Sequence, residues 1–240
     1  FDHRNTQLHD LDDGLLKDYD DSLKNFQKEH NLTIFHLMGQ HVNYKQRYRT
    51  KQARFWASSY EDKRPELTNA QRKMLSHYDN ATLYNDSIVA QIVKRFQKQD
   101  AIVIYVPDHG EECYEENRGF ICRNHSAEID WPLAHYEFEI PFWIYCSPKY
   151  IRNHRDIYRQ IRKVKDKRFM TDALPHLLLY LAGIETPTYK EEYNILSPKY
   201  DEMRPRILKN SADYDKLRDA HLEKIKKEES KKVKKKERRN

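Results

Sequence analysis

The sequence predicts an α/β fold in which helices and strands form a layer sandwich. Apolar residues recur at helical spacing over residues 15–30 and 68–98, and short β-branched runs occupy residues 32–38 and 101–106. Helical and extended segments therefore alternate along the chain, which is the pattern of an α/β layer sandwich. At 240 residues the chain can bury a sizeable core, either as one large domain or as two small ones.

The first part of the chain is expected to hold two amphipathic helices and one strand. The apolar side chains of the first helix recur at spacings of three and four, as Leu15, Leu16, Tyr19, Leu23 and Phe26. A strand over residues 32–38 follows, and the aromatic and basic residues 42–67 are expected to form a long ordered loop. The second helix should begin near the cap residues Thr68 or Asn69 and end near Lys98.

The second part is expected to add two strands and two helices. Residues 101–106 form an uninterrupted apolar run, typical of a buried parallel strand, and residues 138–146 are the third predicted strand. Ser147-Pro148 is a helix-start signal for residues 150–164. A further helix spans residues 171–182, with Thr171 as N-cap and Gly183 just past its end.

The positive charge of the chain is concentrated in its last residues. The formal net charge is +6, and residues 222–240 alone hold 10 basic and 4 acidic side chains. The remainder is therefore neutral, so no nucleic-acid partner is expected, because such a footprint should lie on the folded domain. We predict a folded part over residues 1–210 and a charged, helical or disordered tail over 211–240. The tail is either simply solvated or docks on anionic lipid headgroups.

The clearest chemistry follows the second predicted strand. Asp108 and His109 stand directly after residues 101–106, and Gly110 next to them permits a sharp turn. A carboxylate oxygen and an imidazole nitrogen both ligate divalent metals such as zinc, and open α/β sheets bind ligands at the carboxyl ends of strands. The alternative interpretation is a polar turn at the end of a strand.

Three further histidines are candidates to join this pair. His36 and His41 flank the end of the first predicted strand, and His125 follows His109 by 16 residues. Parallel strands bring their carboxyl ends to one edge of a sheet, so these side chains are expected to converge. The alternative is chance placement, because the chain has 12 histidines, and His36 would then be a core residue.

The cysteines and the apolar runs bound the remaining possibilities. Three cysteines fit neither a disulfide framework nor a zinc-finger spacing. Cys113 and Cys122 bracket the loop after Asp108-His109, so either one local disulfide in an oxidising compartment or two reduced thiols is open. No apolar run is long enough to span a bilayer. The chain begins with Phe1 instead of Met, which is typical of an excised or processed piece of a longer protein.

Several motifs occur in an order that is found in one enzyme family. They are His36-Leu37-Met38-Gly39-Gln40-His41 with Tyr44 and Arg47-Tyr48, Tyr78-Asp79-Asn80 with Tyr84 and Asp86, Asp108-His109-Gly110-Glu111-Glu112 with His125, Ile140-Pro141-Phe142, and Leu181-Ala182-Gly183-Ile184. Over residues 10–185 their order and spacing resemble those of the phosphoethanolamine transferases, which belong to the sulfatase and alkaline phosphatase superfamily. The resemblance implies a doubly wound α/β/α sandwich of that type, incomplete here at its amino-terminal side.

The resemblance also implies a zinc-dependent activity. Such an enzyme transfers phosphoethanolamine from a phospholipid donor to lipid A or a related surface glycan, in a periplasm-facing domain at the bacterial inner membrane. By this resemblance Asp108 and His109 ligate zinc, and His36, His41 and His125 bind the phosphoryl group or a second metal. The nucleophile of the family is a Thr that lies far upstream. We therefore expect this chain to lack both the nucleophile and the membrane segment, and to be inactive alone.

Two other functions remain open on the sequence alone. One is a sulfatase or phosphodiesterase that uses the same scaffold, and the other is a non-catalytic remnant that binds anions. The segment upstream of the chain separates these possibilities. Membrane spans with a nucleophilic Thr favour a transferase, whereas a C-x-P-x-R motif favours a sulfatase.

Overall fold

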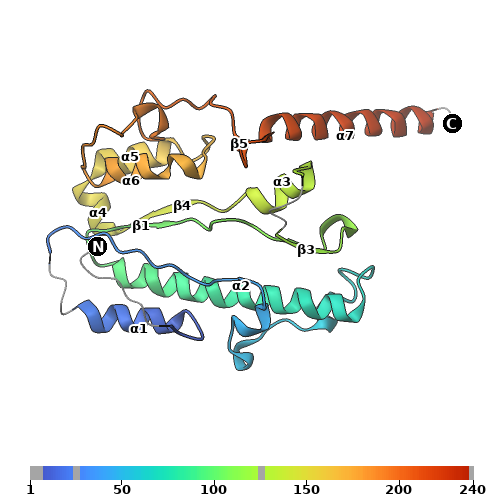
Figure 1. Ribbon diagram of the computed structural model, residues 1–240, viewed down its shortest axis with the longest axis horizontal. Coiled ribbons are helices and arrows are strands. Elements are labelled where there is room, and N and C mark those ends of the chain that lie inside the picture. Colours follow the sequence, from blue (N-terminus) through green and yellow to red (C-terminus); the bar gives the residue numbers. More distant parts are fainter. Residues whose placement is uncertain (1–7, 24–27, 124–127, 238–240) are drawn as a thin grey trace. The chain divides into compact units, whose positions relative to one another are not determined.

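The structure, a computed structural model, describes residues 8–23, 28–123 and 128–237. The chain forms two compact units, residues 1–99 and residues 100–240, and Figure 1 labels the helices and strands of both. None of the helices in the described ranges combines the length and the apolar character needed to cross a membrane.

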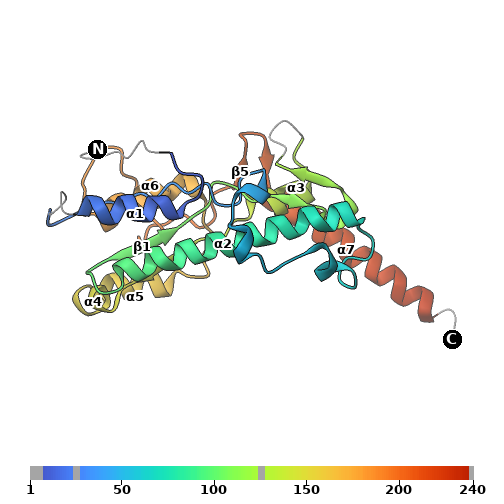
Figure 2. The same cartoon turned by 90° about the horizontal axis from the view of Figure 1, so that it is seen from below.

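The first unit is built on two helices that lie side by side (Figure 2). These are α1 (Asp13–Ser22) and α2 (Asn69–Phe96), and the 3-10 turns η2 (Tyr44–Gln46), η3 (Thr50–Gln52) and η4 (Ala57–Tyr60) lie between them in the chain. The cap predicted for α2 is confirmed. Thr68 Oγ1 accepts a hydrogen bond from Gln71 N at 3.3 Å, and Gln71 Oε1 accepts one from Thr68 N at 2.7 Å. This capping box satisfies two donors that the first turn of a helix leaves open.

A buried amide on α2 holds the long loop that precedes the helix. Asn80 Oδ1 accepts hydrogen bonds from the backbone N–H groups of Arg54 and Phe55, at 2.6 Å and 3.1 Å. Its Nδ2 donates to the carbonyl oxygens of Phe55 and Ser76, both at 2.8 Å. All donors and acceptors of the amide are thereby used. The loop is ordered, as predicted, because its backbone is bound by a side chain of a rigid helix.

The prediction of a first strand over residues 32–38 is wrong. Residues 32–38 form no strand, and the side chains of Leu32 and Ile34 are 75% and 67% exposed. A β-branched run becomes a strand when a neighbouring strand takes its backbone hydrogen bonds, and no strand within the described ranges pairs with these residues. The first helix is also shorter than predicted, since α1 ends at Ser22.

The second unit contains a two-stranded sheet in place of the predicted parallel one. Strands β1 (Ile102–Tyr105) and β4 (Trp143–Cys146) pair antiparallel, with Ile102 opposite Cys146 and Tyr105 opposite Trp143. The interpretation of residues 101–106 as a buried parallel strand is therefore wrong, and every residue of β1 is half-buried. The carboxyl end of β1 consequently lies beside the beginning of β4, and the loop with Asp108 and His109 leaves from there.

Between these strands the chain forms a hairpin and a helix that the sequence did not predict. The hairpin consists of β2 (Glu112–Cys113) and β3 (Phe120–Cys122) with the turn η5 (Glu115–Asn117), and the helix is α3 (Trp131–Phe138). Asp130 caps α3 by accepting a hydrogen bond from Leu133 N at 3.0 Å. Because α3 takes the residues up to Phe138, the third predicted strand is reduced to β4.

The remaining elements cover the sheet and lead to the carboxyl terminus. They are α4 (Pro148–Asn153), α5 (Arg155–Lys163), η6 (Thr171–Ala173), α6 (Leu174–Leu181), η7 (Glu191–Tyr193), β5 (Ile207–Leu208), β6 (Ala212–Asp213) and α7 (Tyr214–Glu237). The helix predicted over residues 150–164 is divided at His154, which has φ −127° and ψ 51°. Thr171 opens a 3-10 turn instead of capping a helix, whereas Gly183 ends α6 with a φ of +65°, as predicted.

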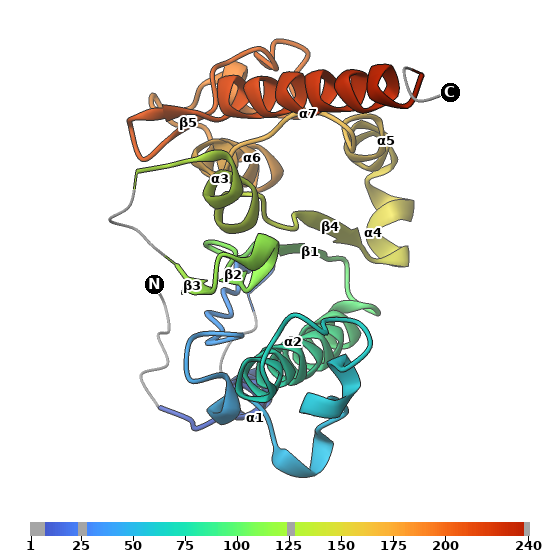
Figure 3. The same cartoon turned by 90° about the vertical axis from the view of Figure 1, so that its right-hand side faces the viewer.

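The segment over residues 184–210, which contains three prolines, contributes to a core. Ile195 and Leu196 are buried with Leu177 of α6 and with Val164, which follows α5. A second core cluster joins α3 to the start of α7 through Leu133 and Tyr214. Figure 3 labels both helices. Helix α7 is thus packed at its beginning, and its residues 222–232 are exposed, as expected for the charged tail.

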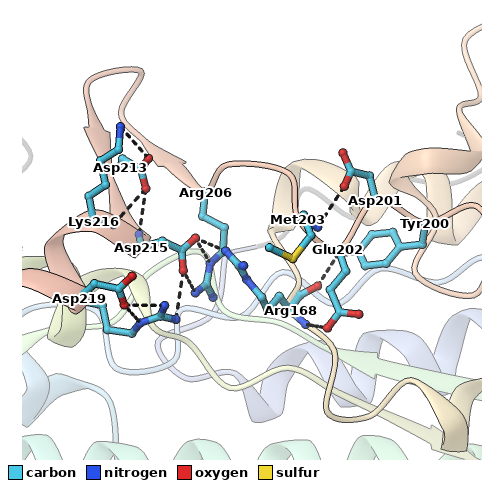
Figure 4. Close-up of polar contacts among 11 residues, drawn as sticks. Arg168, Tyr200, Asp201, Glu202, Met203, Arg206, Asp213, Asp215, Lys216 and Asp219 are labelled. Atoms are coloured by element: carbon cyan, nitrogen blue, oxygen red, sulfur yellow. Dashed lines mark hydrogen bonds and ion pairs between the residues drawn. The ribbon is translucent and has the colours of Figure 1, made fainter. Parts of the chain in front are cut away.

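One carboxylate fixes the beginning of α7 to the rest of the unit (Figure 4). Asp215 accepts hydrogen bonds from Arg168, from Nη2 and Nε of Arg206 at 2.6 Å and 3.2 Å, and pairs with Arg218 at 3.1 Å. The hydrogen bonds from Arg206, followed by the charges of the three arginines, lower the pKa of Asp215 from its ordinary value of 3.8. Burial opposes this shift but does not reverse it.

We predict that Asp215→Asn destabilises the protein by about 2 kcal/mol near neutral pH, the usual size of hydrogen bonds to charged groups. A carboxylate with a lowered pKa stabilises the fold above its unfolded pKa, and this contribution is lost as pH falls below the ordinary value of 3.8. The difference in urea midpoint between the two proteins should therefore shrink in acid. Asp219→Asn, on the same helix but more exposed, is the control and should change little. An equal loss in both variants would contradict the anchoring role of Asp215.

Candidate functional site

The loop after β1 is held against α3 by a close backbone contact. Gly110 N donates a hydrogen bond to the carbonyl oxygen of Glu137 at 2.8 Å. A Cβ atom at Gly110 would lie 2.2 Å from the carbonyl oxygen of Tyr136, closer than any real contact. Only glycine therefore fits this position, and its role is close approach of two backbones. The contact positions Asp108 and His109, the two residues before it.

The hydrogen bonds of His109 define its tautomer. Its Nδ1 lies 2.7 Å from the carbonyl oxygen of Gly110, and its Nε2 lies 2.7 Å from Nη1 of Arg123. A carbonyl only accepts and a guanidinium only donates, so Nδ1 carries the proton and the ring is neutral. The lone pair on Nε2 therefore accepts the hydrogen bond from Arg123. A backbone carbonyl on one ring nitrogen is the usual support of a histidine that ligates a metal through the other.

Asp108 presents its carboxylate beside that lone pair. Asp108 Oδ2 lies 3.6 Å from His109 Nε2, and Asp108 Oδ1 accepts a hydrogen bond from His109 N at 3.1 Å. The side chain of Asp108 is 86% exposed, whereas that of His109 is 18% exposed. The structure thus brings together the two residues that the sequence singled out, with one oxygen and one nitrogen donor on the same side of the loop.

Arg123 is a site residue that the sequence did not reveal. It lies just after β3, and its guanidinium reaches His109 because the β2–β3 hairpin folds back over the loop. The chain has 44 basic residues, so an isolated arginine carried no signal in the sequence. Arg123 could have been placed beside His109 only with the knowledge that Cys122 pairs with Glu112 across the hairpin.

A buried carboxylate lies at the base of the same hairpin. Glu112 Oε1 accepts a hydrogen bond from Arg118 Nε at 2.5 Å, and Arg118 Nη1 donates to Asp130 Oδ2 at 2.6 Å. The Glu112 side chain is fully buried, and its second oxygen, Oε2, has no partner among the described atoms. Arg118 thereby links the hairpin to the residue that caps α3.

Burial raises the pKa of Glu112 above its ordinary value, although the hydrogen bond and charge of Arg118 act in the opposite direction. Removing a carboxylate from water favours its neutral form, and one cation compensates only part of that effect. The ion pair with Arg118 is therefore what permits the charged form of Glu112 inside the hairpin.

Of the two candidate histidines of the first unit, His41 closes a tight turn, in which its N–H donates a hydrogen bond to the carbonyl oxygen of Met38 at 3.0 Å, and His36 precedes this turn. Gly39, with a φ of +51°, is inside this turn, and both oxygens of Asp12 accept backbone hydrogen bonds there, from Met38 N at 3.0 Å and Gly39 N at 2.9 Å. His41 is half-buried, and its Nδ1 lies 3.3 Å from the carbonyl oxygen of Val42. His36 is exposed, so the alternative of a core histidine is wrong.

Not every candidate can be placed. His125 lies outside the described residues, and His36 and His41 belong to a different unit from Asp108 and His109. Within the described ranges no group of three or more His, Cys, Asp or Glu side chains is arranged to hold a metal ion. The convergence of all five residues on one site therefore stays a prediction, as does a Cys113–Cys122 disulfide. Cys113 is buried on β2, and Cys122 is half-buried on β3.

Comparison with known families identifies the scaffold. Residues 2–184 match the family model described as Sulfatase. The chain belongs to the sulfatase family. The predicted resemblance is confirmed by named relatives, and a sulfatase-like α/β fold is the class that the sequence predicted.

The similar curated proteins are phosphoethanolamine transferases. The chain is 31% identical over 202 residues to phosphoethanolamine transferase EptC of Escherichia coli O18:K1:H7. This alignment covers 83% of this chain and 33% of the relative. It is 32% identical over 162 residues to Kdo(2)-lipid A phosphoethanolamine 7''-transferase of Escherichia coli K12, covering 66% of this chain and 27% of the relative. The chain thus spans about a third of the length of the curated relatives that it matches.

Solved structures agree with this assignment. The zinc complex of the C-terminal periplasmic domain of EptC from Escherichia coli superimposes with a TM-score of 0.70 at 28% identity, over 90% of this chain and 60% of that one. The soluble domain of lipooligosaccharide phosphoethanolamine transferase A from Neisseria meningitidis gives a TM-score of 0.61 at 26% identity, over 81% and 57%. Both structures therefore share the fold of this chain and also part of its sequence.

We predict that Arg118→Met destabilises the protein by about 3 kcal/mol near neutral pH, because it leaves a buried carboxylate without its cation. As pH falls, Glu112 takes up a proton and the penalty should diminish, since the raised pKa favours the neutral form. Urea unfolding of wild type and variant, from neutral pH down into acid, measures the effect. Arg159→Met removes an ion pair in which both side chains are exposed and serves as the control. A loss that does not change with pH would assign the effect to Asp130 or to packing, not to Glu112.

Proposed function

We propose that this chain is part of a zinc-dependent phosphoethanolamine transferase that modifies lipid A or a related surface glycan with a group taken from a phospholipid. The pair Asp108 and His109 carries this proposal, because it combines the ligand chemistry of zinc with the motif of the family. The names of the relatives support the transferred group, and the zinc complex of the Escherichia coli domain supports the metal.

The donor set of the loop fits zinc. A tetrahedral zinc ion with bonds of about 2.0 Å places its oxygen and nitrogen ligands roughly 3.3 Å apart. The corresponding atoms, Asp108 Oδ2 and His109 Nε2, are 3.6 Å apart. A small rotation of the exposed carboxylate would bring them to the separation that zinc requires. The neutral imidazole with its proton on Nδ1 needs no change of protonation. Arg123 occupies the position next to Nε2 and has to move when a cation binds there.

The residues of the site divide the work of phosphoryl transfer. Zinc, when bound, stabilises negative charge on the transferring phosphoryl group and activates the nucleophile. Asp108 and His109 hold the ion, and Gly110 and Glu112 keep their loop on α3. Displaced from His109, the guanidinium of Arg123 is within reach to pair with a phosphoryl oxygen, a geometry that suits arginine.

The candidate histidines supply further donors for the phosphoryl group or a second metal. The turn of His41 is held in place by Asp12 and Arg47, and Arg47 Nε donates a hydrogen bond to the carbonyl oxygen of His41 at 3.1 Å. His36 and His125 are proposed for the same role from their motifs. The Thr nucleophile and the membrane segment are proposed to lie on the parts of the protein that the longer relatives have and that this chain does not match.

The proposed location is the periplasmic face of the bacterial inner membrane. The similar structures are periplasmic domains, which supports this placement, and a phospholipid donor is available at that surface. A sulfatase or phosphodiesterase would use the same zinc scaffold, but the named relatives favour a transferase.

We predict that Asp108→Ala and Arg123→Met change zinc affinity in opposite directions. Asp108→Ala removes a ligand and should abolish the zinc that wild type binds, whereas Arg123→Met removes a cation next to the site. At about 1 kcal/mol for two unit charges 4 Å apart in water, the second change should raise affinity about fivefold or more. Elemental analysis and calorimetric titration with zinc measure both effects. Wild type itself should bind weakly, because the two identified ligands are fewer than the four of a complete site.

The control for these variants is Arg152→Met, which removes an exposed arginine on α4. It should leave zinc affinity unchanged. Equal zinc content in wild type and Asp108→Ala would overturn the assignment of Asp108 as a ligand.

We also predict that the 240-residue chain binds phosphate or phosphoethanolamine in the presence of zinc but does not transfer it. Binding and charge stabilisation are separable from nucleophilic attack, for which the Thr is needed. His41→Ala should weaken binding about 10-fold, as expected for the loss of a hydrogen bond to a charged group. Titration calorimetry measures binding, and phosphoethanolamine transfer to a lipid A acceptor measures activity.

His30→Ala, which alters an exposed histidine of the same unit, is the matched control and should bind as wild type does. Turnover by the 240-residue chain alone would reveal a nucleophile within it and contradict the proposed mechanism. Absence of any phosphate binding with zinc present would contradict the proposed site.

A further inference from the structure

Helix α7 carries the excess positive charge of the whole chain on an exposed surface. Residues 222–240 hold 10 basic and 4 acidic side chains, which equals the net charge of +6 of the protein. The helix runs to Glu237, and its residues 222–232 are exposed. The family match ends at residue 184, so this helix lies outside the part of the chain that the family model describes.

Three of its lysines form a row along the helix. Lys224, Lys227 and Lys231 follow one another at spacings of three and four residues, which places them on one face. All three are exposed. The ion pair of Lys227 with Glu223, at 3.3 Å, joins two side chains that are 73% and 71% exposed, so it neutralises little of this charge. After Ile225 the described part of α7 has no apolar stripe, and the face is therefore electrostatic in character.

The beginning of α7 is rigidly joined to the unit that contains Asp108 and His109. Its first turn is tied down by Asp215, and the ring of His221 stacks on Trp131 of α3, with centroids 5.2 Å apart at an angle of 24°. Helix α3 in turn receives the hydrogen bond from Gly110 N. The orientation of the lysine row is thus linked through α3 to the loop of the candidate site.

We propose that the lysine row of α7 docks the second unit on the anionic surface of a phospholipid bilayer. Rigid attachment to α3 means that docking would orient the site loop relative to the membrane, and would not merely tether the chain. An extended surface potential suits a helix in which glutamates are interspersed, because attraction then depends on the summed charge. Nucleic acid, by contrast, is recognised by basic residues arranged to meet individual phosphates.

The relatives and similar structures favour a bilayer as the partner. One relative is named for its lipid A substrate, and the similar solved domains are periplasmic. The inference itself rests on the charge and placement of α7. It does not depend on whether the site transfers phosphoethanolamine, so the two proposals fail independently.

The experiment compares two triple variants that remove the same charge from the 240-residue chain. Lys224→Gln, Lys227→Gln and Lys231→Gln remove the row, and Gln keeps the helix propensity. Lys149→Gln, Lys163→Gln and Lys165→Gln remove three exposed lysines elsewhere in the same unit and serve as the control. Binding is measured by co-sedimentation with vesicles of equal parts phosphatidylglycerol and phosphatidylcholine, with pure phosphatidylcholine vesicles, and with a DNA duplex at equal phosphate concentration.

We expect wild type to bind the anionic vesicles and to lose this binding as salt is added. At about fivefold per basic residue near the surface, the row variant should bind roughly 100-fold more weakly. The control triple should bind as wild type does. Equal losses in the two triples, equal binding to neutral vesicles, or tighter binding to DNA than to anionic vesicles would each overturn the proposal.

Discussion

The close contact between Gly110 and the end of α3 determines how the rest of the site is arranged. One hydrogen bond, from Gly110 N to the carbonyl oxygen of Glu137 at 2.8 Å, joins two backbones that no larger residue would allow to approach. Asp108 and His109 precede this contact, and the β2–β3 hairpin follows it. The donor pair therefore owes its geometry to α3, although no side chain of α3 takes part in the chemistry.

Two anionic side chains show how the number of partners decides the state of a buried carboxylate. Asp215 has three arginines around it, and their hydrogen bonds and charges lower its pKa. Glu112 has one arginine and is fully buried, and there the loss of water prevails and raises the pKa. The first arrangement fixes α7 at low energetic cost, whereas the second retains a destabilising charge in the hairpin that carries Arg123.

Helix α3 also connects the site to the part of the chain beyond the family match. It contacts the loop of the site through Glu137 and the start of α7 through Trp131 and Leu133. The family model accounts for residues 2–184, and the relatives are about three times as long as the matched stretch. Helix α3 therefore contacts both the loop of Asp108, inside the family match, and the start of the charged helix, which lies beyond it.

The sequence by itself determined the features that depend on residues near each other in the chain. The helix cap at Thr68, the αL glycine after α6, the Asp108-His109 pair and the charge of the tail all follow from local patterns, and the structure contains each of them. Tertiary structure decided the features that need a distant partner. Residues 32–38 have the composition of a strand, but no strand in the part of the chain that the structure describes pairs with them. Strand β1 runs antiparallel to β4, and Arg123 reaches His109 only because a hairpin turns back. Backbone pairing and side-chain contacts across the fold depend on which segments meet in space, and local propensity carries no information about that.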